Sequence, residues 1–530
     1  MRLSRCLSGA GLGLLAAGAL YAQHHDSASD KASPRLGKAE FPTSAPPAAQ
    51  AEFMKGLLYL HSFEYQAAER AFRAAEALAP DFAMAYWGEA MTYNHGVWNE
   101  QDLSSARGAL ERLGPTAEAR RAKTGTERER GYLAAVEALY GEGTKPGRDT
   151  LYAAAMERVV RENPSDLEAK AFYALALLGL NQGVRDTSTY LRAAPWADTV
   201  FRANPNHPGG AHYLIHAYDD PIHASLGLAA ARAYSRIAPD AAHAQHMTTH
   251  IFMALGMWDD VVAQNEIAVG LTAASPGHYT SWLLYGLLEQ GRYEAAERLL
   301  GEVRGNLSGT LRGQYTELAR MRAHYLLQAE NWRSTVFGWK LDPDRMTLLG
   351  QITEVYADGV IAYRRRDPAR LTRAASEVGR LVEAQGTDRA HGDPELGQAQ
   401  VMAKELGGML LFLSDRRDEA VRVLREATAI EDALPMEFGP PAIIEPSHEV
   451  LGTMLLEMRP LEARREFERA LVLAPGRSRA LIGLTRSAIA VADKPAAAAA
   501  MDRLTANWRR SDPRVRDAVL PLRHVVERMP

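Results

Sequence analysis

Residues 51–80 read AEFMKGLLYLHSFEYQAAERAFRAAEALAP, and this stretch decides the fold. It predicts two antiparallel helices. The small residues Gly56 and Ala68 would let the two helices approach closely, and Tyr59 and Phe72 would fill the space between them. The proline at the end of the stretch cannot continue a helix, so it would end the second one.

The same pattern returns along the chain. Pro205 and Pro239 lie 34 residues apart and bracket a further unit, and Gly291-Arg-Tyr293 is typical of an interhelix turn. Strand signals are nearly absent, since alternating Val/Ile/Thr runs and Asn-Gly hairpins are missing. The second half of the motif reappears near the C-terminus as Ala463, Phe467, Ala470 and Pro475.

With Gly, Tyr, Ala, Phe, Ala and Pro at these offsets, the chain resembles the tetratricopeptide-repeat (TPR) family, whose period is 34 residues. The resemblance implies an all-α fold, a right-handed solenoid of antiparallel helix pairs over residues 51–510. Segments such as GGAHYLIHAYDDP are similar to those of a group of exported bacterial TPR proteins. That group supplies no catalytic residue for this chain.

The first residues predict export. Arg2 and Arg5 precede an uncharged, small and apolar stretch from Cys6 to Ala22, which is typical of a secretory signal peptide. We therefore expect cleavage after Ala22 and a periplasmic or secreted protein. No later window is long and apolar enough for a membrane span.

The sequence divides into further segments. Residues 23–50 are rich in Ser, Pro and Ala and predict a disordered tether. An N-terminal array over 51–383 would carry a histidine cluster at 207–250. A hinge at 384–395 would separate it from a C-terminal array over 396–510, and residues 511–530 would form a tail or a capping helix.

Composition excludes several classes of function. The 61 Lys+Arg residues nearly balance 65 Asp+Glu residues, which is not the charge of a dedicated nucleic-acid binder. The single cysteine, Cys6, lies in the predicted signal peptide, so a disulfide scaffold and thiolate-rich metal sites are excluded. The 16 histidines remain as the abundant metal-binding side chain.

The histidines follow the repeat period. His212 and His246 are 34 residues apart, and so are His216 and His250. Equivalent positions of neighbouring repeats lie side by side in a solenoid, so these four side chains should form a square facing the concave groove, with His243 one turn above. Imidazoles on helices packed 8–10 Å apart can share an ion.

Three interpretations of this cluster stay open. His212, His216, His243, His246 and His250 could bind a transition metal such as Cu, Zn or Fe, with Asp219, Asp220 or Glu266 adding a carboxylate. They could instead line a polar groove for a ligand, or be structural. We expect His278, His324, His391 and His524 to be structural, and further groove candidates are His61, His95, His223, His448 and Glu449.

Two functions follow from these patterns. The first is an exported TPR scaffold that binds a protein or peptide partner in its groove. The second is a metal-dependent protein, an oxidase or a hydrolase, with a histidine-rich centre in the groove, and the sequence does not decide whether the chain is an enzyme. In either case histidines titrating near pH 6–7 should weaken binding as the pH falls through that range.

Overall fold

The computed structural model describes residues 34–182, 185–272, 274–307, 311–384, 394–437 and 439–530. The predicted signal peptide lies outside these residues. Within them the fold is all-α, and the strands are limited to one short antiparallel pair, β1 (Asn94–His95) with β2 (Glu100–Gln101). Five short 3₁₀ turns lie at Gly96–Trp98, Gly179–Asn181, Thr335–Gly338, Pro343–Arg345 and Trp508–Arg510.

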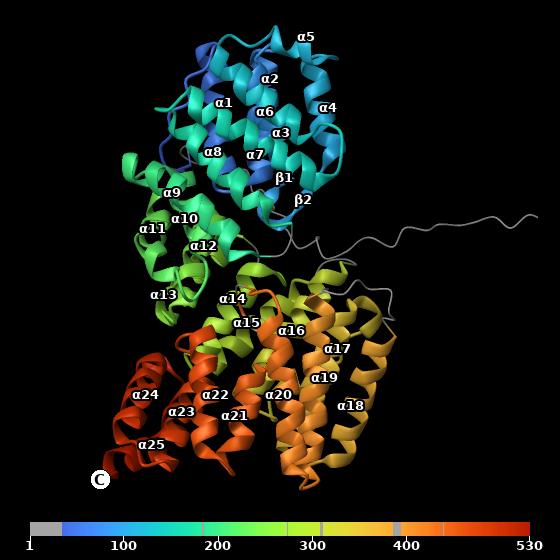
Figure 1. The fold of residues 1–530 in the computed structure, drawn as a ribbon, viewed down its shortest axis with the longest axis vertical. Helices are drawn as coiled ribbons and strands as arrows, with labels where there is room; N and C mark the ends of the chain where they lie inside the picture. Colours follow the sequence, from blue (N-terminus) through green and yellow to red (C-terminus); the bar gives the residue numbers. More distant parts are fainter. Residues whose placement is uncertain (1–33, 183–184, 273, 308–310, 385–393, 438) are drawn as a thin grey trace, which may run out of the picture.

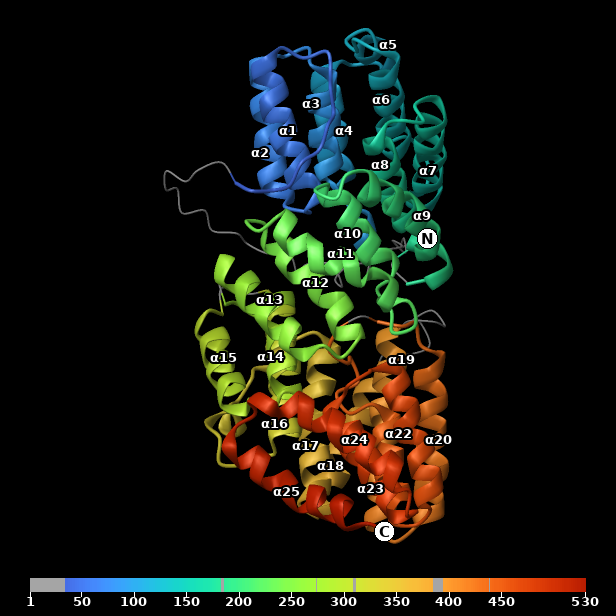
Figure 2. The same cartoon turned by 90° about the vertical axis from the view of Figure 1, so that its left-hand side faces the viewer.

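The helices form two lobes (Figures 1 and 2). The first, drawn blue to green, contains α1 (Pro47–His61), α2 (Tyr65–Leu78), α3 (Ala83–Thr92), α4 (Leu103–Leu113), α5 (Ala117–Arg121), α6 (Glu127–Leu139), α7 (Lys145–Glu162), α8 (Leu167–Leu178), α9 (Thr187–Ala203), α10 (Pro208–Ala217), α11 (Ala224–Ile237), α12 (Ala242–Ala254) and α13 (Trp258–Leu271). The second, drawn yellow to red, contains α14 (His278–Glu289), α15 (Tyr293–Gly305), α16 (Arg312–Ala329), α17 (Leu348–Arg364), α18 (Pro368–Glu383), α19 (Pro394–Leu413), α20 (Arg417–Ala433), α21 (Ser447–Leu456), α22 (Pro460–Leu473), α23 (Ser478–Ala490), α24 (Lys494–Asn507) and α25 (Pro513–Arg528).

The repeat motif produces the same packing at both ends of the chain. An added Cβ at Gly56 or Gly88 would come within 2.7 Å or 2.4 Å of the Phe72 ring. Near the C-terminus, Gly483 lies as closely against the Phe467 ring, at 2.2 Å. Each ring is thus wedged against helices whose glycines leave room for it. The predicted solenoid of antiparallel helix pairs is confirmed.

The end of the predicted tether is packed rather than disordered. Leu36 and Phe41 are buried, and Arg35 forms an ion pair of 2.9 Å with Asp240. Helix α1 begins at Pro47, four residues before the predicted start of the array. Residues 34–46 form no helix, but the buried side chains of Leu36 and Phe41 anchor this segment. The tether prediction is therefore wrong for these residues.

A second core crosses the predicted hinge. Residues 385–393 lie outside the described part of the chain. Helices α18 and α19, on either side, pack on each other, and their buried residues Leu381 and Ala399 share one core. A first core covers the lobe that contains α1 to α13.

Two turns far apart in the sequence join the lobes. Gly256 and Gly476 both have positive φ, +69° and +81°, and their backbones touch. An added Cβ at Gly256 would lie 2.3 Å from the carbonyl oxygen of Pro475. The indole nitrogen of Trp258 donates to the Gly476 carbonyl oxygen at 2.9 Å. This contact holds the end of α12, which belongs to the histidine cluster, against the second lobe.

The last helices return to the start of the second lobe. The Trp508 indole nitrogen donates to the Glu289 carbonyl oxygen at 3.0 Å, and the Asp512 amide donates to that of Gly291. Residues 513–528 form α25. In the part of the chain that the structure describes, no helix combines the length and apolar character that crossing a membrane requires.

Candidate metal centre

Helices α10 and α12 bring all five predicted histidines together. The sequence PGGAHYLIHA places His212 and His216 one turn apart on α10, and AHAQHMTTHIFMA places His243, His246 and His250 on one face of α12. The side chains do not face an open groove, because all five residues are buried, with exposed fractions of 4% or less. The predicted exposed square is therefore wrong in this respect. The helices pack so tightly that the cluster lies between them.

The first group contains His212, His216 and His243. One ring nitrogen of each lies within 4.8 Å of the others. The Nδ1 atom of His212 donates to the carbonyl oxygen of His61 at 2.6 Å, so its Nε2 atom carries a lone pair. That lone pair faces Nε2 of His243 at 3.1 Å.

His216 has no hydrogen bond to satisfy it. Both of its ring nitrogens are buried and find no hydrogen-bond partner among the described residues. A buried imidazole without a partner costs free energy, on the order of 1–3 kcal/mol. Its ring lies against that of His212, with centroids 4.9 Å apart. A metal ion shared with the two neighbouring histidines would offset this cost.

The second group contains His246, His250 and His278, whose nitrogens also lie within 4.8 Å of one another. Asn265 fixes the orientation of His246. Its Nδ2 atom donates to the Val261 carbonyl oxygen at 3.0 Å, which leaves Oδ1 to accept from Nδ1 of His246 at 2.8 Å.

Asp219 plays the same role for His250, because it accepts from Nδ1 at 2.6 Å. The Nε2 atoms of His246 and His250 therefore both carry lone pairs, yet they lie 3.1 Å apart. Two nitrogens at this distance, each with a lone pair, could bind one cation together. Carboxylate and amide groups that accept from Nδ1 are the usual supports of metal-binding histidines.

Burial keeps these rings neutral. It lowers the pKa of His212 to about 3 and that of His278 to about 4. The pKa values of His216, His243, His246 and His250 also lie well below the usual range, because burial and neighbouring rings disfavour the charged form. The expected titration at pH 6–7 is thus wrong for the folded protein. Neutral imidazole is the form that binds metal ions.

Aromatic rings cover much of both groups, although His278 is only half-buried. Trp282 stacks on His250, with ring centroids 4.3 Å apart, and Phe63 lies 4.3 Å from His212. Phe63 has φ +54°, in the left-handed region, while Gly256 and Gly291 have positive φ in corresponding turns. A bulky residue is strained in this conformation. Here its ring also contacts His216 and His243.

A third group, His61 with Glu168 and His207, is already satisfied. The two Glu168 oxygens each lie 2.8 Å from one histidine Nε2 atom. The adjacent histidines hold the pKa of Glu168 far below its usual range despite its burial. His61 also contacts the Tyr213 hydroxyl at 2.9 Å. The predicted groove residue His61 is thus fully buried in a hydrogen-bonded network.

The remaining groove candidates lie elsewhere. His95 stacks on Tyr65, with centroids 3.9 Å apart, and Nδ1 of His223 contacts Asp220 at 2.9 Å.

In the second lobe, His448 contacts Glu466 at 2.7 Å, and Glu449 pairs with Arg477. Of the three carboxylates suggested by the sequence, Asp219 supports the centre. Asp220 instead caps the turn of His223, and Glu266 lies 3.6 Å from Arg292.

Sequence reasoning missed two residues of the centre. His278 was expected to be structural, but it opens α14, the first helix of the next repeat, and joins the second group. It falls two residues short of the 34-residue register of His246. A search for histidines one repeat beyond His246 that allows a shift of two residues would have found His278. Asn265 gave no comparable signal.

The fold is similar to that of solved TPR structures. The crystal structure of the yeast Tom70 has 15% identity and a TM-score of 0.25, covering 90% of this chain and 95% of that one. The P58(IPK) TPR domain has 14% identity and a TM-score of 0.22, covering 83% and 97%. Alignments with TM-scores of this size do not by themselves establish a shared fold. No protein-family model matches the sequence, and no curated protein matches it either.

Proposed function

We propose that this TPR-like chain is a metal-dependent protein that holds two transition-metal ions, one in each histidine group. The two groups of three histidines, each with ring nitrogens within 4.8 Å of one another, carry this proposal, together with His216, whose buried ring nitrogens find no partner among the described residues. The two groups adjoin each other, since the rings of His216 and His250 have centroids 6.2 Å apart. The two ions would therefore share one buried site.

Copper fits the donor set best. All six proposed ligands are imidazoles, and the carboxylate of Asp219 supports a ring instead of facing the shared space. Imidazole suits Cu, Zn, Fe and Ni, and among divalent ions copper binds such sites most strongly. Bound copper would supply one-electron redox chemistry, which favours an oxidase over a hydrolase. This chain's residues hold the rings neutral and exclude water.

Metal analysis of the purified full-length chain tests the proposal. After reconstitution with copper, zinc or ferrous iron and exhaustive dialysis, we expect two equivalents of copper per chain. His246→Ala should lose at least one equivalent. His324→Ala is the matched control, because His324 is an equally buried histidine outside the centre. Less than a tenth of an equivalent of every metal would refute the proposal.

A second function, a scaffold for a protein or peptide partner, is favoured by a cleft of about 710 Å³ in the second lobe. Aromatic side chains, four arginines and three glutamates line it. Arg364 and Arg479 pair with glutamates of the lining, and Arg486 and Arg514 add further positive charge beside Tyr293 and Tyr363. An acidic peptide with apolar residues would match this lining. Arg486→Glu should abolish binding in a peptide-array assay, whereas Arg236→Glu, on the first lobe, should not. Equal binding by both variants would refute it.

Export completes the proposal. The basic and apolar residues from Met1 to Ala22 support secretion to the periplasm or beyond. N-terminal sequencing of the protein from the extracytoplasmic fraction should begin at Gln23. Recovery of the uncleaved chain only from the cytoplasm would contradict this part of the proposal.

A further inference from the structure

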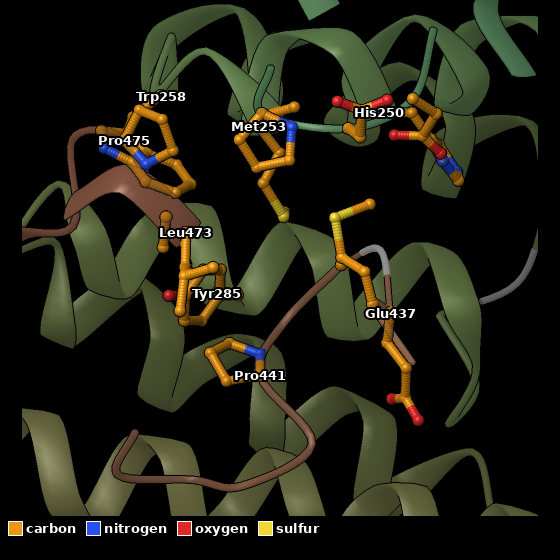
Figure 3. A pocket seen from close by; sticks show the side chains of 15 residues that line it. His250, Met253, Trp258, Tyr285, Glu437, Pro441, Leu473 and Pro475 are labelled. Atoms are coloured by element: carbon orange, nitrogen blue, oxygen red, sulfur yellow. Dashed lines mark hydrogen bonds and ion pairs between the residues drawn. The ribbon is translucent and has the colours of Figure 1, made fainter. Parts of the chain in front are cut away.

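A small pocket lies beside the second histidine group (Figure 3). Its volume is about 70 Å³. It lies between the end of α12, the turn after α10, the segment before α21 and the turn at 473–475. His250 lines the pocket and also belongs to the second group. The pocket therefore reaches the buried centre directly.

The donors of the pocket favour a soft cation. Two thioethers line it, Met253 from α12 and Met436 from the segment before α21. Met253 points from its helix toward the segment that carries Glu437 (Figure 3). Thioether sulfur is a soft ligand that selects Cu(I) over harder ions.

The charges of the pocket also favour a cation. Asp219, Asp220 and Glu437 contribute carboxylates, and the described lining residues include neither lysine nor arginine. Asp219 contacts the His250 ring, so one of these carboxylates lies at the inner end of the pocket. The Arg185 guanidinium lies 3.6 Å from Asp219 and offsets part of this negative charge, which leaves the two other carboxylates to attract a cation.

The size of the pocket sets a second limit. The space that the centre of a water can reach is several times the about 10–15 Å³ that one water needs, so the pocket takes a few waters or a partly hydrated ion. The wall is close-packed, since an added Cβ at Gly439 would come within 2.8 Å of Trp282, the residue that stacks on His250.

We propose that this pocket is a transient binding site for Cu(I) and the route by which it reaches the histidine centre. The inference rests on the proposed copper centre. The thioethers of Met253 and Met436 would receive the ion, and His250 would pass it inward to His246 and His278. No electron is transferred in this step, because the ion keeps its charge and only exchanges ligands.

Loading kinetics of the full-length protein test this route. Cu(I) would be presented anaerobically as a complex with a chromogenic chelator, and its transfer followed in a stopped-flow instrument. We expect a Met253→Leu, Met436→Leu double variant to load about tenfold more slowly, the order of effect that loss of an auxiliary donor has. Its final copper content should equal that of the wild type. Leucine conserves the side-chain volume, so folding should be little affected.

Two further variants sharpen the test. Glu437→Gln changes an exposed residue and should also slow loading. Met54→Leu, a methionine of α1 outside the pocket, should load at the wild-type rate. Unchanged rates in the pocket variants, with two equivalents still bound, would overturn the route and leave the centre standing. Loss of one equivalent would also overturn it, since the methionines would then be permanent ligands. A wild type that binds no copper would overturn both proposals.

Discussion

The Nε2 atoms of His246 and His250 lie 3.1 Å apart, although the Nδ1 atom of each ring is already bonded, to Asn265 and Asp219. The two supports orient these nitrogens toward each other. A metal-free protein with this geometry would hold an unfavourable arrangement in its core. Such a site is expected to trade stability for metal binding, and this trade can be measured.

The variant His216→Leu should stabilise the metal-free protein and impair the loaded one. Leucine would replace a buried imidazole whose two nitrogens have no described partner, and it would remove the cost of burying them. We expect the metal-free free energy of unfolding to rise by about 1–3 kcal/mol. Copper content should fall by one equivalent.

Urea unfolding with and without copper measures both effects in the same variant. Without copper, the variant should be more stable against urea than the wild type. With copper bound, the wild type should be the more stable of the two. A less stable metal-free variant with an unchanged copper content would show that His216 is a structural residue.

Acid should destabilise the metal-free protein below pH 6.5. In the unfolded chain a histidine titrates near 6.5, whereas burial lowers the folded pKa to about 3 for His212 and about 4 for His278. The unfolded state therefore binds more protons between these values, and stability is present above pH 6.5 and lost as the pH falls. By pH 5, each such histidine should lower the free energy of unfolding by about 2 kcal/mol.

Asp219 opposes this trend in part. Burial raises its pKa from 3.8 to about 6, so the folded state takes up a proton there first, and this favours folding as the pH falls from 6 to 4. Six histidines outweigh one carboxyl group. Thermal unfolding at pH 7.5, 6 and 5 checks the net sign, and a melting temperature that stays constant over this range would contradict it.

Sequence reasoning could predict the fold and most of the centre because both depend on a period. The Gly–Phe contacts of Phe72 and Phe467, and the pairing of α10 with α12, follow from positions repeated along the chain. Burial of the cluster could not be predicted in this way. It depends on how the turn at Phe63 and the indole of Trp282 cover the rings, and neither contact leaves a periodic signal.

The variant Asp219→Asn should weaken the binding of one metal ion and leave the binding of the other unchanged. The Asp219 carboxylate orients His250 in the second group and makes its Nε2 more basic. Loss of such a support typically lowers metal affinity about 10–100-fold. Competition with a chelator should therefore show one copper ion that is bound more weakly than in the wild type and one that is bound equally tightly. Asp220→Asn, at the adjacent residue, should leave both affinities unchanged, because Asp220 contacts His223 instead. Equal weakening by both variants would indicate a general loss of local structure.

Glu168→Gln should lower stability without changing the metal content. Glu168 holds His61 and His207 through two contacts of 2.8 Å, and because these histidines lower its pKa despite its burial, we expect it to be ionised in the folded protein. Removing one partner of a buried pair typically costs about 3–5 kcal/mol, because the other partners are left unsatisfied. The variant should unfold at lower urea concentration and still bind two equivalents of copper. The wild type should also bind two equivalents and not three, because the nitrogens facing Glu168 are already bonded. A third equivalent that disappears in Glu168→Gln would show instead that this group is a metal site of its own.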